Sequence, residues 1–96
     1  MSAYWINFFL EVRDPDKVAA YAELATPAIA EAGGRFLARG VPAAVFEQGR
    51  ETRTVIIEFP SVEAAQACYD SPAYRRSLDA LGDGAVRDIR IVPGVD

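Results

Sequence analysis

The sequence predicts an α+β fold in which helices cover one face of a four-stranded antiparallel sheet. Three observations carry this prediction. The 96 residues are the size of one domain, which we take to span residues 1–96. The composition, 51% hydrophobic and 25% charged, is that of an ordinary globular protein. Stretches with a two-residue apolar period alternate along the chain with stretches of helical period.

The first strand and the first helix have the clearest sequence signals. Residues 3–12 alternate with a period of two and are rich in aromatic and β-branched side chains, which indicates a strand. Asp14 and Pro15 then read as a helix N-cap followed by proline at the first helical position. An apolar stripe at helical spacing follows. Gly33 and Gly34 end this helix, because glycine accepts the left-handed conformation found at helix ends.

The remaining elements follow from the same two periods and from cap residues. We expect a strand over residues 35–39, its continuation or a separate edge strand over 43–48, a third main strand over 53–59, a helix capped by Ser61 that restarts at Ser71 and Pro72, and a last strand over 86–92. The resulting order is β-α-β-β-α-β, the ferredoxin-like arrangement. Its helices form one layer, and the other face of the sheet is open.

Side-chain alternation along the strands assigns residues to the two faces of the sheet. We expect the wholly apolar set of the first strand to face the helices, so that the other set faces away. The open face would then carry Trp5, Asn7, Phe9, Leu37, Ile56, Glu58, Arg35, Arg39 and Arg90. A face this apolar and this charged fits two interpretations. Either a second copy covers it sheet to sheet, or a homodimer encloses a small pocket whose polar groups orient a ligand.

Several function classes are disfavoured by composition. The net charge is −4, whereas binding to a phosphate backbone normally requires a basic face. The chain has no histidine and one cysteine, Cys68, so we expect no metal site and no cofactor. Cys68 falls in a predicted amphipathic helix, where a small buried apolar residue is expected. We find neither a signal peptide nor a membrane span and expect a cytoplasmic protein whose partner is itself.

Four segments of the chain resemble one family. They are AYWI at residues 3–6, PAIAEAGGRFLARG at 27–40, IEFPSVEAA at 57–65 and YDSPAY at 69–74. Together and in this order they resemble a family of short bacterial proteins, the domain-of-unknown-function family 1330. That family is similar to the dimeric α+β barrel superfamily, in which two ferredoxin-like units pack sheet against sheet. The superfamily includes cofactor-free monooxygenases, isomerases, haem enzymes and stress-response proteins, and many of its catalytic members use a histidine that this chain lacks.

Four polar side chains are the main candidates for chemistry. We predict that Glu58, in mid-strand among apolar residues, moves a proton, and that Asn7 polarises a carbonyl or an oxyanion. Arg39 and Arg35 could clamp a carboxylate or enolate with their planar donor forks. The structural alternative is that the arginines pair with Glu47 or Glu58, and that Asn7 makes a cross-strand or interface hydrogen bond.

Three aromatic side chains complete the predicted site. Trp5 could stack on a planar ligand or pack in the interface, and Tyr69 and Tyr74 could line the mouth of a pocket. Ser71, which lies between them, is better explained as a helix cap. The sequence therefore predicts a cofactor-independent enzyme acting on a small anionic or planar organic molecule. The alternative is a non-catalytic small-ligand-binding or stress-linked dimer.

Overall fold

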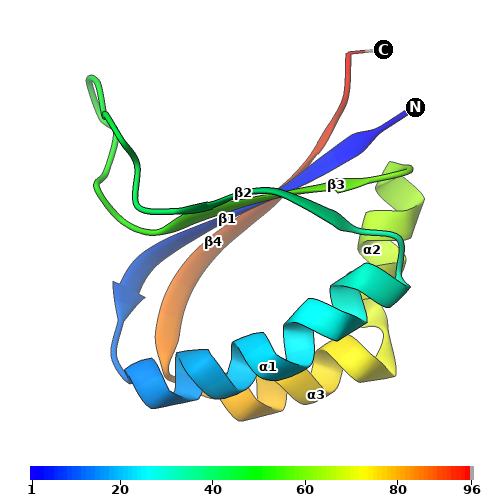
Figure 1. Ribbon diagram of the computed structural model, residues 1–96, viewed down its shortest axis with the longest axis horizontal. Coiled ribbons are helices and arrows are strands. Elements are labelled where there is room, and N and C mark those ends of the chain that lie inside the picture. Colours follow the sequence, from blue (N-terminus) through cyan, green and yellow to red (C-terminus); the bar gives the residue numbers. More distant parts are fainter. Residues whose placement is uncertain (96) are drawn as a thin grey trace.

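The chain forms four strands and three helices in the predicted order, β-α-β-β-α-β, with the second helical region divided in two (Figure 1). This computed structural model describes residues 1–95. The elements are β1 Ala3–Val12, α1 Pro15–Glu31, β2 Arg35–Gly40, β3 Thr54–Phe59, α2 Val62–Asp70, α3 Pro72–Leu81 and β4 Ala85–Pro93.

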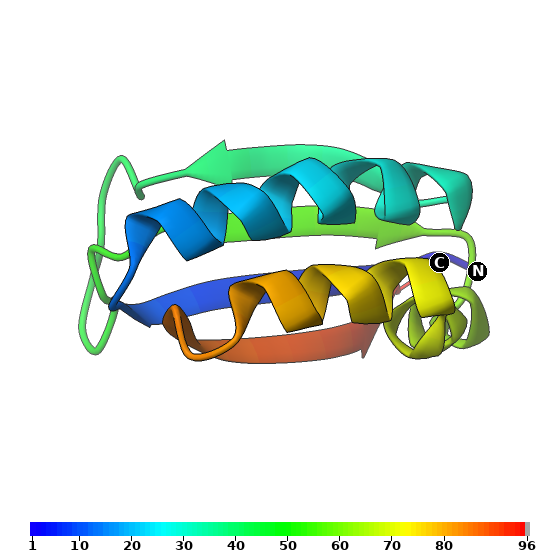
Figure 2. The ribbon, with the colours of Figure 1, turned by 90° about the horizontal axis from the view of Figure 1, so that it is seen from below.

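The four strands make one sheet in the order β2-β3-β1-β4, and every neighbouring pair is antiparallel. All three helices lie on the same face of this sheet (Figure 1). Figure 2 shows α1 and α3 side by side in front of the strands, with the shorter α2 at one end. The ferredoxin-like prediction is therefore confirmed. We call the opposite, uncovered side of the sheet the open face.

Side-chain caps determine where the helices begin. The Asp14 carboxylate accepts hydrogen bonds from the backbone N–H groups of Asp16 and Lys17, at 3.0 and 3.4 Å, at the start of α1. Ser61 caps α2 in the same way. Ser71 accepts from the Tyr74 N–H at 3.2 Å, so α3 begins directly after α2 ends, and the predicted cap role of Ser71 is confirmed.

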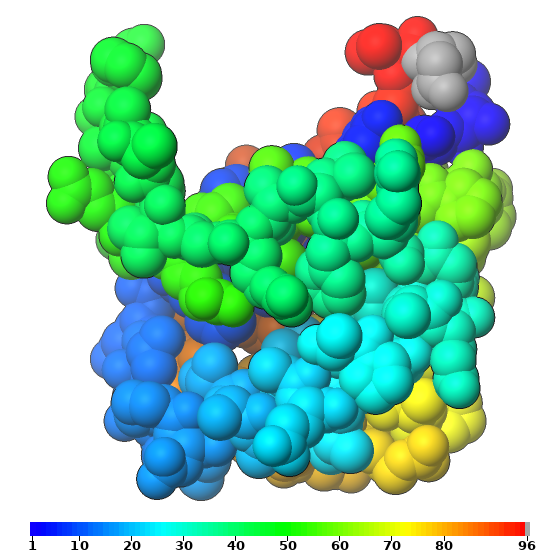
Figure 3. Space-filling view, in the orientation of Figure 1, coloured from blue at the N-terminus to red at the C-terminus, as the bar shows by residue number. Residues whose placement is uncertain are grey.

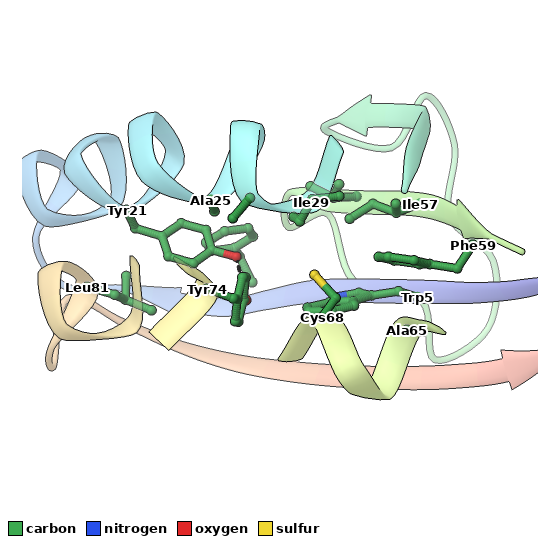
Figure 4. Close-up of a cluster of buried hydrophobic side chains, with 13 residues drawn as sticks. Trp5, Tyr21, Ala25, Ile29, Ile57, Phe59, Ala65, Cys68, Tyr74 and Leu81 are labelled. Atoms are coloured by element: carbon green, nitrogen blue, oxygen red, sulfur yellow. Dashed lines mark hydrogen bonds between the residues drawn. The ribbon is translucent and has the colours of Figure 1, made fainter. Parts of the chain in front are cut away.

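The core lies between the sheet and the helices and is built on aromatic rings (Figure 4). Trp5 is 1% exposed, and its ring centroid lies 5.7 Å from that of Phe59 and 5.2 Å from that of Tyr74. Cys68 is also buried, as predicted, and burial raises the pKa of its thiol to about 11. A thiol with so high a pKa stays protonated and behaves as a small apolar side chain.

A strand over residues 43–48 was predicted, and this prediction is wrong. The segment belongs to a long connection between β2 and β3, residues 41–53, which we call the arm. Pro42 has no backbone donor for a sheet ladder, and the Gly49 N–H donates to the Phe46 carbonyl at 2.8 Å in a local turn. The arm rises from the sheet on the open side, on which the two termini also lie (Figure 1).

The predicted faces of β1 are reversed. Trp5, Asn7 and Phe9 are buried on the helix side, and the wholly apolar alternate set, which begins at Tyr4 and Ile6, lies on the open face. Both sets of β1 are largely apolar, so apolarity alone could not decide between them. The register decides: Trp5 pairs with Ile57 and therefore shares its face, which is the helix side.

The predicted common face of Arg35 and Arg39 is also wrong. Arg35 pairs with Glu58, but the register of β2 against β3 shifts between Phe36 and Ala38. This irregularity places Arg39 opposite Val55, on the helix side. The two arginines of one short strand thus lie on opposite faces of the sheet.

Candidate functional site

Four polar side chains lie on the helix side of the sheet, in the otherwise apolar space between the sheet and the helices. Asn7 comes from β1, Arg87 from β4, Tyr21 from α1 and Tyr74 from α3. We call them the inner polar cluster. Asn7 pairs with Ile89 and Phe9 pairs with Arg87, so Asn7 and Arg87 are diagonal neighbours on adjacent strands.

The Asn7 carboxamide is buried without full hydrogen bonding. The residue is only 4% exposed, and among the described residues its Oδ1 atom has no hydrogen-bond partner. Leaving such a group unpaired costs about 1–3 kcal/mol. An orphan of this kind calls for a bound water or ligand that completes it.

Arg87 has an unpaired hydrogen-bond donor, whereas the unpaired atom of Asn7 is an acceptor. Within residues 1–95 its Nη1 atom is buried and has no hydrogen-bond partner, and no carboxylate lies within ion-pairing distance of the guanidinium. The guanidinium carbon lies 4.6 Å from the Tyr21 ring centroid and 5.9 Å from that of Phe9. Burial alone would lower the pKa of Arg87, but the phenol oxygens of Tyr21 and Tyr74 raise it overall. The site therefore holds a permanent positive charge.

The two tyrosines are joined by their hydroxyl groups. The oxygen atoms of Tyr21 and Tyr74 lie 2.7 Å apart, and Figure 4 shows this bond bridging α1 and α3. Burial, reinforced by the Tyr21 hydroxyl, raises the pKa of Tyr74 far above its usual value. Tyr74 therefore stays protonated, so it can orient an oxygen atom but cannot act as a base.

A surface groove touches this cluster at one residue. It has a volume of about 570 Å³, lies between α3 and β4, and reaches Arg87. Its other lining residues are mainly apolar and include Tyr69, Leu78, Leu81, Ile89 and Ile91. One cation in an apolar groove is a suitable environment for a small organic molecule with a single electronegative group.

Glu58 and Arg35 lie on the open face, away from the inner polar cluster. The Arg35 Nη2 atom donates to the Glu58 Oε1 atom at 2.7 Å, and the Tyr4 hydroxyl donates to Oε2 at 3.3 Å. This is the ion pair that the sequence offered as the structural alternative. Glu58 is therefore not placed beside Asn7, as a shared catalytic role would require.

The structure brings some of the predicted site residues together and separates others. Asn7, Trp5, Tyr69 and Tyr74 gather on the helix side, where Trp5 and Tyr74 are core residues and Tyr69 is half buried. Arg39 is also on that side, with its guanidinium carbon 4.8 Å from the Phe36 ring centroid.

Arg87 and Tyr21 were not predicted. Arg87 has the same strand parity as Ile89 and Ile91, which were expected to face the helices, so parity could have found it. Tyr21 lies in the apolar stripe of α1 and gave no separate signal.

Two classes of feature are absent from residues 1–95. No group of three or more acidic, cysteine or histidine side chains is arranged to hold a metal ion in this part of the chain. Within the same residues, no helix combines the length and the apolar character needed to cross a bilayer.

Comparison with known proteins gives the family. The sequence profile of DUF1330, a domain of unknown function, matches residues 2–95, and the chain belongs to this family. Among curated protein sequences no match is found.

Solved structures share the fold at low sequence identity. RPA0582, a protein of unknown function from Rhodopseudomonas palustris, superposes with a TM-score of 0.75 at 17% identity, over 99% of this chain and 83% of that one. SnoaB, a cofactor-independent oxygenase from Streptomyces nogalater, gives a TM-score of 0.67 at 14% identity, over 99% and 94%. A dimeric protein of unknown function from Bacteroides fragilis gives 0.63 at 12%, over 97% and 96%.

Proposed function

We propose that the protein is a cofactor-independent enzyme that binds a small planar enol or phenol in the inner polar cluster and stabilises its anion. The observation that carries this proposal is the pair of buried orphan atoms, Asn7 Oδ1 and Arg87 Nη1. One is an acceptor and the other a donor. A neutral hydroxyl group on a planar ring has both functions, because it can donate to Asn7 and accept from Arg87; after ionisation the anion accepts from Arg87 and, once the amide has turned, from the Asn7 NH2 group.

The chemistry follows from the charge of Arg87. A guanidinium beside a bound hydroxyl stabilises the ionised form and lowers the pKa of the ligand. The resulting anion is electron-rich, and SnoaB, which shares the fold, is a cofactor-independent oxygenase. Oxygen uptake is therefore the first activity to assay.

The alternative is a non-catalytic ligand-binding or stress-linked dimer, and one observation favours it. Among the described residues the buried polar side chains are Asn7 and Ser77, so no buried carboxylate is placed to act as a general base. In the enzymatic account the substrate must lose its proton to solvent. Binding of phenols without any turnover, tested across a panel of planar enols and phenols, would support the alternative.

The binding step can be tested with 4-nitrophenol, whose phenolate absorbs visible light. We expect saturable binding to the wild-type protein and a decrease of about one unit in the pKa of the bound phenol, equivalent to about 1.4 kcal/mol. Arg87→Gln should abolish the pKa decrease. Arg76→Gln is the control, because Arg76 is an exposed arginine of α3, away from the inner polar cluster and from the open face. An unchanged pKa decrease in Arg87→Gln would contradict the proposal.

We further propose that the active form is a homodimer joined through the open face, as the family resemblance implies. In the single chain this face leaves apolar side chains partly exposed on β1, Ile56 on β3, and Val92, which is 43% exposed, on β4. The arm adds Phe46, which is 79% exposed, and borders a groove of about 530 Å³ on the sheet. Figure 3 shows the hollow between the arm and the terminal segments, a shape suited to a second copy.

Sedimentation tests the dimer directly. Wild type should sediment as a dimer, and Ile56→Glu should give a folded monomer, because a charge in a sheet-to-sheet interface loses its hydration. Leu24→Glu is the control, since Leu24 is a 42% exposed leucine on α1. A monomeric wild type at micromolar concentration would contradict this part of the proposal. A cytoplasmic location also remains a prediction.

A further inference from the structure

The residues on the helix side of the sheet fall into three rows that cross the strands. The first row is apolar: Phe36, Ile57, Trp5 and Ile91. The second row is Arg39, Val55, Asn7 and Ile89. The third row is Arg53, Phe9 and Arg87, because Phe9 pairs with Arg87 and its N–H donates to the Arg53 carbonyl at 2.9 Å. The helix side is therefore apolar at one end and cationic at the other.

The arginines of these rows have aromatic neighbours and no acidic partners. Arg39 stands over Phe36, and the Arg53 guanidinium carbon lies 6.0 Å from the Phe9 ring centroid. Neither side chain is in an ion pair with any residue between 1 and 95, although acidic residues outnumber basic ones, 14 to 10, in the whole chain. Most of the other basic residues form ion pairs with carboxylates. Cations left unpaired in an acidic protein are available to an anionic ligand.

The buried side chains of the opposing helices do not supply that anion. In α1 they are Tyr21, Ala25, Ala28 and Ile29, and in α3 they are Tyr74, Ser77 and Leu81. Figure 3 shows the surface hollowed between the start of α1 and the sheet, with orange atoms of the C-terminal part of the chain visible behind. This end of the space between the layers is therefore open to the surface.

The two arginines of the third row lie on either side of Phe9 in the sheet. Arg53 and Arg87 are separated by one strand, so their backbones lie about 10 Å apart at the usual strand spacing. The Phe9 ring lies between them in the same row, with its centroid 6.0 Å from the Arg53 guanidinium carbon and 5.9 Å from that of Arg87, so a planar ligand that reaches both guanidinium groups would stack on this ring. Arg39 is a diagonal neighbour of Arg53 across β2 and β3, close enough to share one carboxylate.

We propose that Arg39 and Arg53 bind an acidic substituent of the ligand whose hydroxyl group is held by Asn7 and Arg87. The substrate class is thus a planar hydroxy acid: an enol or phenol that also carries a carboxylate. This inference rests on the proposed function, since it assigns the second end of the same ligand. Arg39 and Arg53 act as specificity-determining residues, and both are exposed enough to exchange water for a carboxylate at little cost.

Two chromogenic probes that differ by one carboxylate test this assignment: 4-nitrophenol and 5-hydroxy-2-nitrobenzoate. We expect the wild-type protein to bind the carboxylate probe about five- to tenfold more tightly at low salt, and the preference to shrink as salt screens it. Arg39→Gln and Arg53→Gln should each reduce the preference about threefold, and the double variant should remove it. Affinity for 4-nitrophenol should not change. Arg76→Gln, which alters an exposed arginine of α3, is the control.

The outcomes separate this inference from the proposed function. Equal affinity for the two probes, or a preference that survives in the double variant, overturns the roles of Arg39 and Arg53. A carboxylate preference without any decrease in the phenol pKa supports these two roles and overturns the role of Arg87. Failure of the carboxylate probe to bind saturably overturns the inference outright.

Discussion

The two faces of the sheet differ in whether their polar groups are paired within the chain. On the open face the charges are paired within the chain: Arg35 with Glu58 at 2.7 Å, and Arg90 with Asp88 at 2.8 Å. The hydrogen bond from Arg90 lowers the pKa of Asp88, so this carboxylate stays ionised at neutral pH. On the helix side Asn7 and Arg87 are left with orphan atoms in a drier place. The polar groups of the open face are thus paired within the chain, whereas the proposed site is built on the two unpaired atoms of the helix side.

Side-chain truncations on the two faces of the sheet should differ most in how much they lower the free energy of unfolding. Trp5→Ala removes a ring packed against Phe59 and Tyr74 and should lower the free energy of unfolding by about 3–5 kcal/mol at every protein concentration. Ile6→Ala, next to it on the open face, should cost less, and its cost should depend on concentration, because Ile6 would be buried mainly by a partner. Urea unfolding at two protein concentrations measures both. Equal, concentration-independent losses would remove the distinction between the faces.

The pH dependence of the free energy of unfolding tests whether the thiol of Cys68 is shielded from water on the helix side. Burial raises the pKa of the thiol from 9.0 to about 11, so the folded state holds the proton more tightly than the unfolded state does. The stabilisation is complete below pH 9 and is lost as the pH rises toward 11. We expect the free energy of unfolding to fall by about 1.4 kcal/mol more between pH 8 and pH 10 in wild type than in Cys68→Ala. Identical pH profiles would contradict the burial of the thiol.

The charge pair on the open face should matter least. Glu58→Gln removes one partner of Arg35, whose side chain is 73% exposed in the single chain, so in the monomeric Ile56→Glu background the loss of stability should be under about 1 kcal/mol. Binding of 4-nitrophenol should be unaffected, because Glu58 lies on the other side of the sheet. Calorimetry and absorbance titration measure the two effects. A lost phenol pKa decrease would restore the proton-transfer role predicted for Glu58.

The sequence predicted the order of elements well because local signals encode it. The caps at Asp14, Ser61 and Ser71 and the glycine pair after α1 depend on neighbouring residues only, and all three caps lie where they were expected. The arm was mispredicted because residues 43–48 contain apolar residues without the pairing partner that makes a strand.

The candidate site could be predicted only in part, because it depends on register. The pattern of β1 shows that its two faces differ, but which face meets the helices is decided by pairing with β3. A single irregularity near Leu37 moved Arg39 to the other face. Asn7 was therefore predicted on the open face and Tyr74 at the mouth of a pocket, whereas both are buried on the helix side. Arg87 was missed, although its position in the strand alternation predicts that it faces the helices.

The central claim is that Asn7 is kept for a ligand and not for the fold. Replacing Asn7 by Leu, which is similar in size, tests it in one measurement, the free energy of unfolding of the ligand-free protein. The account predicts that Asn7→Leu is as stable as wild type or more stable by about 1 kcal/mol, because a buried orphan acceptor disappears. A loss of 1–3 kcal/mol would show that Asn7 has a structural partner, and would contradict the site proposed on the helix side.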